Sequence, residues 1–295
     1  MNDFKSIKLE DKPIFDDFFA QDPPQCSEYT FTNLFMWKER YRTTWRVWKD
    51  CLLIVFCPGD DVHYGLQPIG QGDKRAALDY LADHVSTLTD NVQVCRVAEN
   101  FIEEHVSSGR YEVIKDRDNS DYVYLAQELA ELPGNKFHKK KNHVNKFIKN
   151  NEFEYRPLDS KVVDLCLDLQ EEWCELRECV LNPALFDENM AVYEALKNYQ
   201  QLGFVGGAFL IDSKVEAFSF GEKLNPETAV IHVEKANSQI SGLYAAINQH
   251  FCQVEWTDIK YINREQDLGQ EGLRKSKKSY HPHHMVDKYI VSLRM

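Results

Sequence analysis

A run of polar residues near the end of the chain combines the side chains that an acyl-transfer site would need. The run from Asn263 to Asp267 directly follows a short apolar stretch. Arg264, together with Lys275 further along, could hold a phosphate or a carboxylate, because cationic side chains bind such anions through charge-assisted hydrogen bonds. Glu265 or Asp267 could accept a proton from an attacking amine. The run therefore predicts a polar pocket in which a nucleophile is activated.

The same residues also permit a structural interpretation. Asp267 could be the N-cap of the helix that follows, with Gly269 near its start and Glu271 in its first turn. Capping does not require all three side chains from Asn263 to Glu265. We therefore interpret that run as a site and leave Asp267 open between helix cap and catalyst.

A second polar group lies on the predicted strand 228–236. Side chains alternate along a strand, so His232 and Glu234 point to one face and Lys235 points to the other. The His–Glu pair could orient an acceptor or act as a base. Alternatively, it is a polar pair on a solvated face, and Glu216 and Glu222 on the neighbouring strands favour that interpretation.

The elements that would position these residues can be predicted from hydrophobic periodicity and turn residues. In the first half we expect a hairpin that turns at Lys49-Asp50, a helix opened by Asp73, and a strand pair over residues 111–125. In the second half we expect two helices and three antiparallel strands, then helix, strand, helix and strand. These last seven elements are predicted at 202–211, 214–224, 228–236, 238–256, 259–265, 269–280 and 287–293.

The order of elements predicts a tandem repeat. Each half opens with a strand that ends in a leucine–acid pair, and the two halves close on "DYVYL" at Asp121 and "DKYIV" at Asp287. Pro133-Gly134 marks a boundary. We predict two units, residues 1–133 and 134–295, each a mixed α/β structure with helices on both faces of a sheet.

The second unit has the element order of the GNAT N-acetyltransferase fold. In such a sheet, a crevice opens where an antiparallel strand gives way to a parallel neighbour, and a helix N-terminus faces the crevice. Backbone N–H groups between Ser238 and Gly242 could hold a phosphate there, helped by the helix dipole.

Specific motifs carry a family resemblance over nearly the whole chain. "IHVEKAN", "GLYAAINQHF" and "YINREQDLGQEGLRKSKKSYHP", with "SEYTFTNLFMWKERY" near the start, resemble the DUF2156 group. That group is similar to the C-terminal domain of phosphatidylglycerol lysyltransferases, which has two GNAT-like units. The resemblance implies transfer of an aminoacyl group from a charged tRNA to an amine or hydroxyl on a small-molecule, lipid or peptide acceptor.

The donor is the point at which the sequence departs from the acetyltransferase pattern. Gln239 and Gly242 are present, but the full Q/R-x-x-G-x-G/A loop of acetyl-CoA-using enzymes is not. This favours aminoacyl-tRNA over a coenzyme A thioester as the donor, and no cofactor is certain. It also fits a unit that has lost its donor, which leaves a non-catalytic module that binds a small molecule or a partner as the alternative function.

A basic segment could meet the tRNA. Six lysines and no acidic residue lie between Lys136 and Lys149, with His138 and His143 among them. Such a segment suits a phosphate backbone. A solvated helix face or linker would explain it equally.

The bulk composition narrows the class of protein. Hydrophobic residues make up 43% of the 295 residues, enough for a substantial core. The net charge of −12 argues against general nucleic-acid wrapping, although a local basic groove remains compatible with it. No integral membrane segment and no signal peptide is predicted, so we expect a cytoplasmic protein. The eight cysteines lack metal-site spacing and are expected to be reduced, and neither they nor His281, His283 and His284 predict a metal site.

Overall fold

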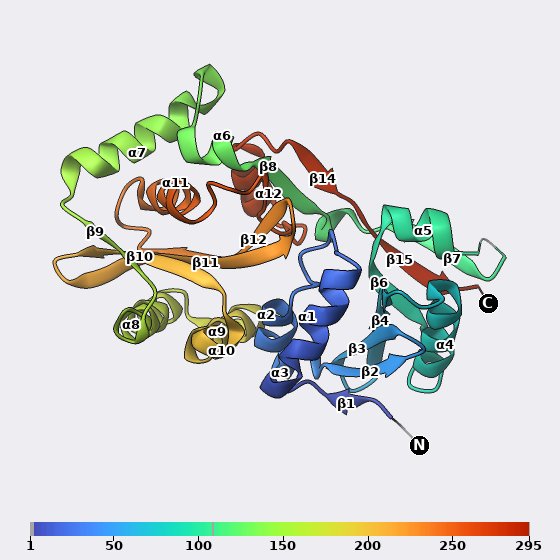
Figure 1. The fold of residues 1–295 in the computed structure, drawn as a ribbon. Coiled ribbons are helices and arrows are strands. Elements are labelled where there is room, and N and C mark those ends of the chain that lie inside the picture. Colours follow the sequence, from blue (N-terminus) through green and yellow to red (C-terminus); the bar gives the residue numbers. More distant parts are fainter. Residues whose placement is uncertain (1–2, 108, 295) are drawn as a thin grey trace. The chain divides into compact units, whose positions relative to one another are not determined.

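The computed structural model describes residues 3–107 and 109–294, which form two compact units (Figure 1). The first unit comprises Met1–Asp121, Gln266–Gln270 and Met285–Met295. The second comprises Tyr122–Glu265 and Glu271–His284. Both are mixed α/β structures, as the resemblance implied. Among the described residues, no helix combines the length and the apolar character needed to span a membrane.

The first unit is built on an eight-stranded sheet in the order β1-β2-β3-β4-β6-β15-β7, with β5 paired to β3. Its strands are β1 Lys5–Ser6, β2 Thr44–Trp48, β3 Cys51–Gly59, β4 Val62–Leu66, β5 Ile69–Gly70, β6 Gln93–Ala98, β7 Tyr111–Lys115 and β15 Lys288–Leu293. Its helices are η1 Leu9–Asp11, α1 Lys12–Gln21, α2 Phe31–Met36, α3 Lys38–Tyr41, α4 Lys74–Ser86, α5 Glu99–His105 and η2 Arg117–Asn119.

Local signals in the first unit act as the sequence predicts. Lys49 and Asp50, with φ of 44° and 59°, form the two-residue turn of the β2–β3 hairpin. Turns of this kind suit hairpins because their twist matches that of the strands. Asp73 caps α4 by accepting the N–H of Ala76 at 3.0 Å. The apolar faces of α4 and β3 then share one buried core with β6 and β15.

The second unit has a seven-stranded sheet in the order β14-β8-β13-β12-β11-β10-β9. Its strands are β8 Asp121–Leu125, β9 Glu154–Pro157, β10 Val205–Ile211, β11 Lys214–Asn225, β12 Thr228–Ala236, β13 Tyr261–Asn263 and β14 His284–Val286. Its helices are α6 Ala126–Glu131, η3 Asn135–Phe137, α7 His138–Asn150, α8 Ser160–Leu176, η4 Cys179–Leu181, α9 Pro183–Lys197, α10 Tyr199–Leu202, α11 Leu243–Glu255 and α12 Glu271–Lys278. In Figure 1, α7 and α11 lie on one side of this sheet, and α8 and α9 lie on the other.

Each sheet contains a junction between parallel strands. In the second unit, β12 pairs with β13 only from Thr228↔Tyr261 to Val230↔Asn263, and β12 then continues alone on that side to Ala236. In the first unit, β4 pairs with β6 through Gly65↔Val94 and Leu66↔Cys95. The parallel junction predicted for the second unit is therefore present, and the first unit contains a parallel pair as well.

The closing strands lie in different sheets from those that the sequence indicated. Both strands expected over residues 111–125 are present, but they do not pair with each other: β7 pairs with β15 in the first sheet, and β8 pairs with β13 in the second. Consequently the division of the structure differs from the predicted boundary at residues 133 and 134. Periodicity gives the order of strands but not the sheet that each one joins.

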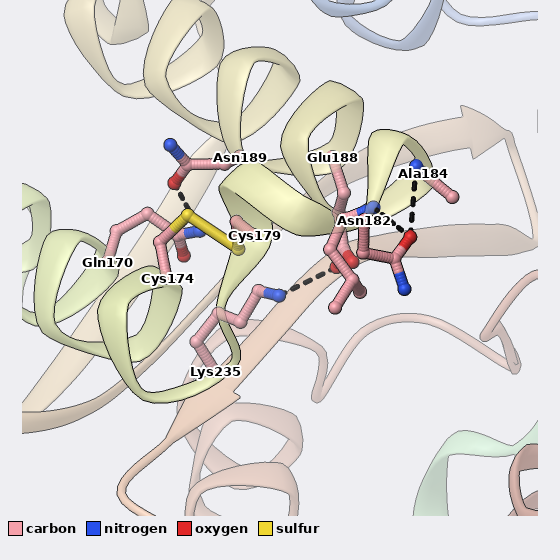
Figure 2. Close-up of a disulfide and its surroundings, with 9 residues drawn as sticks. Gln170, Cys174, Cys179, Asn182, Ala184, Glu188, Asn189 and Lys235 are labelled. Atoms are coloured by element: carbon pink, nitrogen blue, oxygen red, sulfur yellow. Dashed lines mark hydrogen bonds and ion pairs between the residues drawn. A yellow bond between two sulfur atoms is a disulfide. The ribbon is translucent and has the colours of Figure 1, made fainter.

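One pair of cysteines also differs from expectation. Cys174 in the last turn of α8 and Cys179 in η4 form a disulfide (Figure 2), although all eight cysteines were expected to be reduced. The intervening turn, with Glu178 in the left-handed region at φ 52°, brings the two Cα atoms to 5.1 Å, a span that a disulfide bridges. The other cysteines are free: Cys26, Cys51, Cys57, Cys95, Cys166 and Cys252.

Candidate functional site

The polar run and the strand residues predicted as a site come together where β12 and β13 diverge in the second unit. Asn263 ends β13, so Arg264 and Glu265 follow directly. His232 contacts Glu265 and Glu234 contacts Arg264, which places both predicted groups on one face of β12. Lys235 faces the other side and pairs with Glu188 of α9 at 2.7 Å (Figure 2).

His232 is held between two carboxylates. Its Nε2 lies 2.9 Å from an oxygen of Glu222, and its Nδ1 lies 3.0 Å from an oxygen of Glu265. Its side chain is only 1% exposed. Burial alone would lower the pKa of His232, but the hydrogen bonds that it donates to Glu222 and Glu265 outweigh this effect and raise the pKa to about 9. At neutral pH His232 is therefore an imidazolium that donates from both nitrogens, and it has no lone pair with which to act as a base.

Glu265 has the geometry of a proton acceptor in this arrangement. Its backbone is in the left-handed region at φ 57°, which costs a non-glycine residue about 1 kcal/mol or more. The side chain of Asn263 holds this conformation by accepting the N–H of Glu265 at 2.8 Å. The carboxylate is 21% exposed, so a nucleophile from solvent can reach it while His232 fixes its orientation.

Arg264 is more constrained than the sequence indicated. Its Nη2 and Nε donate to the same oxygen of Glu234, at 2.5 and 3.1 Å. Its guanidinium carbon lies 4.6 Å from the ring centre of Tyr280 and 5.7 Å from that of Tyr124. Burial opposes the charge, but Glu234 and the tyrosines raise the pKa of Arg264. Arg264 thus links β12 to the segment after β13 and stacks on an aromatic wall.

Two residues of this region escaped the sequence interpretation. Glu222 counted there only as a sign of a solvated face, yet it is the second partner of His232. Lys140 counted only as one of six lysines, yet its ammonium lies 3.9 Å from the ring centre of Tyr280. Burial, followed by the charge of Arg264, lowers the pKa of Lys140 to about 8. The Glu222–His232 and Lys140–Tyr280 contacts each join two different elements of the fold, so no local sequence pattern could predict them.

The predicted phosphate-binding helix end is already in contact with another helix. Gly242, the residue before α11, has φ 88°, and a Cβ there would lie 2.2 Å from the backbone oxygen of His143 in α7. The N–H of Gln239 donates to the side chain of Asn237 at 3.0 Å, and that of Ile240 donates to the Asn237 backbone at 3.2 Å. Part of the surface that a pyrophosphate would use is therefore taken by the protein itself.

The remaining predicted residues make other contacts. Asp267 belongs to the first unit, where its buried carboxylate lies 3.4 Å from Arg117 and accepts the N–H of Gly269 at 2.9 Å. Gly269, with φ 73°, is in the same turn. Lys275 is exposed on α12 of the second unit.

Comparison with known proteins shows what this chain is similar to. A family model described as phosphatidylglycerol lysyltransferase, C-terminal, matches residues 20–292. A crystal structure of a conserved protein of unknown function from Bacteroides thetaiotaomicron is 36% identical over all of both chains, with a TM-score of 0.93. Two further structures share the fold. The DUF2156 C-terminal domain of a protein described as a lysylphosphatidylglycerol synthetase from Agrobacterium fabrum has a TM-score of 0.68 at 11% identity, covering 96% of this chain and 91% of that one. L-PGS from Bacillus licheniformis has a TM-score of 0.67 at 10% identity, covering 95% and 91%.

Proposed function

The chain belongs to the family of phosphatidylglycerol lysyltransferase C-terminal domains, and from this membership we propose that it transfers an aminoacyl group from aminoacyl-tRNA to an amine or hydroxyl acceptor. The observation that carries the proposal is the Glu222–His232–Glu265 chain at the divergence of β12 and β13. It supplies a partly exposed carboxylate whose position is fixed by a charged imidazolium. A direct transfer needs such a group.

In the proposed reaction the acceptor nitrogen or oxygen attacks the carbonyl carbon of the aminoacyl ester. A new C–N or C–O bond forms, and the bond between the carbonyl carbon and the ribose oxygen breaks. Glu265 takes the proton that the nucleophile loses and returns it to the leaving ribose oxygen. His232 keeps its proton throughout and orients Glu265, so it is a positioning residue rather than the base.

The choice of donor rests on two features of the second unit. The start of α11 packs against α7 at Gly242 and already satisfies the N–H groups of Gln239 and Ile240, which disfavours a coenzyme A pyrophosphate there. The helix α7 exposes four lysines, Lys139, Lys141, Lys146 and Lys149, as a polyanionic donor would require. Both features favour aminoacyl-tRNA.

The test is a transfer assay with charged tRNA and, separately, with acetyl-CoA, using phosphatidylglycerol vesicles and small amines as acceptors. Glu265→Gln should lower the rate from charged tRNA by about 10²-fold, because it removes the proton acceptor. Glu271→Gln, an exposed change at the start of α12, is the control and should leave the rate unaltered. Transfer only from acetyl-CoA, or an unchanged rate in Glu265→Gln, would overturn the proposal.

The alternative is a binding module without catalysis. The pairing of Arg264 with Glu234 and of His232 with two carboxylates favours it, because such closed ion pairs also occur as purely structural networks. Stabilisation of the protein by charged tRNA, with no transfer to any acceptor, would support this alternative over the enzyme.

A further inference from the structure

We propose that Lys140 binds a phosphodiester group of the substrate beside Arg264 and Tyr280, an inference that rests on the proposed function. Lys140 lies near the start of α7, whereas Arg264 follows β13 and Tyr280 follows α12. All three belong to the second unit. The site would thus be a cationic position beside Arg264, the residue that precedes the predicted proton acceptor Glu265.

The orientation of Lys140 distinguishes it from the other lysines of the basic segment. Lys136 pairs with Glu128 at 2.6 Å, and Lys139 and Lys141 are exposed. Lys140 is half-buried, with its ammonium 3.9 Å above the ring of Tyr280. Its ammonium forms no hydrogen bond or ion pair with the described residues. The exposed lysines of α7 are enough to attract a polyanion at long range. The inward orientation of Lys140 therefore indicates a separate, local role.

The charge around Tyr280 is not balanced. Arg264 lies 4.6 Å from the same ring, and Glu234, which would offer the compensating carboxylate, is already engaged by Arg264 through two hydrogen bonds. The Arg264–Glu234 pair is therefore neutral, and Lys140 leaves one positive charge in a partly desolvated place. An anion bound between Lys140 and Tyr280 would offset that cost.

The titration of Lys140 agrees with this imbalance. Burial and the charge of Arg264 lower its pKa to about 8, and the opposing charge of Glu234 offsets only part of this shift. Of the groups around it, Tyr280 has its pKa raised by burial to about 12, and burial also raises the pKa of Tyr124 and Cys252. Those three stay neutral near pH 8. Anion binding should therefore weaken as Lys140 loses its proton.

A phosphodiester is the anion that the proposed reaction would present. Both a phosphatidylglycerol headgroup and the end of a tRNA carry one, and a lysine ammonium binds phosphate as a point charge. The two sources share this chemistry but differ in what surrounds it. Separate probes can distinguish them.

The experiment titrates the full chain with glycerophosphoglycerol and, separately, with the trinucleotide CCA, followed by calorimetry. One probe should bind to the wild type, and Lys140→Gln should weaken that binding about ten-fold. Lys141→Gln removes the same charge from the exposed side of α7 and should change affinity by less than about two-fold. Lys140→Arg should keep the affinity at about pH 6.5 and retain it at about pH 9.5, where the wild type loses it.

Equal weakening in Lys140→Gln and Lys141→Gln would show only long-range attraction and would overturn the inference, as would a failure of both probes to bind. The proposed function fails separately. If probe binding depends on Lys140 but no transfer from charged tRNA occurs, the binding site is supported and the proposed reaction is contradicted. If Lys140→Gln transfers with the same KM as the wild type, the proposed reaction is supported and the binding site is contradicted.

Discussion

The parallel junctions of the two units are alike in layout and different in chemistry. In each, an arginine follows the last paired residue: Arg96 after Cys95 in the first unit, and Arg264 after Asn263 in the second. In the first unit the gap beyond the junction is bridged by a hydroxyl. Tyr29 donates to the backbone oxygen of Arg96 at 3.0 Å and accepts the backbone N–H of Gln67 at 2.8 Å.

Arg96 of the first junction also forms ion pairs, with Glu28 at 2.9 Å and with Asp116 at 2.8 Å. At the second junction, ionisable side chains of β12 pair with those of the segment after β13. His232 and Glu234 of β12 reach across to Glu265 and Arg264. These groups are 1 to 21% exposed, whereas Tyr29 is 1% exposed and both its partners are backbone. At the second junction a partly exposed carboxylate, Glu265, faces the imidazole of His232 across the gap, an arrangement that can take up a proton. We therefore propose that the chemistry lies in the second unit.

The largest expected effect lies in the first unit, at Lys288. This buried ammonium donates to Asp121 at 2.6 Å and to Glu28 at 2.5 Å, and the side chains of Lys288 and Asp121 are 0% exposed. Lys288→Met would remove the cation that these two buried carboxylates share, so the free energy of unfolding should fall by about 3–5 kcal/mol, measured by urea denaturation.

The matched control is Lys115→Met. Lys115 pairs with Asp287 next to the same strand β15, but its side chain is 48% exposed, so the loss should stay within about 1 kcal/mol. Equal losses of unfolding free energy in the two variants would mean that the buried ion pairs of Lys288 stabilise the first unit no more than an exposed pair does.

The second prediction concerns pH and belongs to the second unit. The pKa of His232 is about 9 in the folded chain and about 6.5 when unfolded. Because the pKa is higher in the folded chain, protonated His232 stabilises the fold fully below pH 6.5. This contribution to the free energy of unfolding, up to about 3 kcal/mol, is lost as the pH rises through 9. Urea denaturation across this range should show the decline in the wild type. His232→Gln should flatten it, and parallel curves for both proteins would contradict the ion-pair assignment.

Much of the fold could be predicted from sequence because its signals are local. The turn at Lys49-Asp50, the cap at Asp73 and the three antiparallel strands β10–β12 all appear as expected. The placement of β8 and β15 in opposite sheets could not be predicted. Both are short apolar strands that begin with a charged residue, and only pairing with distant partners decides which sheet each one joins.

The candidate site was predictable where it follows from strand alternation, and not where it depends on tertiary contacts. The shared face of His232 and Glu234 follows from the two-residue period of a strand. That His232 would be charged depends on Glu222 from the adjacent strand, and the inward turn of Lys140 depends on how α7 packs. Asp267 looked like part of the same run, yet the chain passes into the first unit one residue before it.

The smallest expected effect separates the two junctions most directly. Tyr29→Phe removes one hydroxyl and leaves the N–H of Gln67 and the backbone oxygen of Arg96 unsatisfied, so it should lower the free energy of unfolding by about 1–2 kcal/mol. Tyr289→Phe, which removes an exposed hydrogen bond to Glu99 from the same sheet, should cost less. Neither change should alter transfer from charged tRNA or binding of the phosphodiester probes. Loss of either activity in Tyr29→Phe, with the fold retained, would place chemistry in the first unit, since a hydroxyl that only joins backbone groups has no route by which to affect a substrate bound elsewhere.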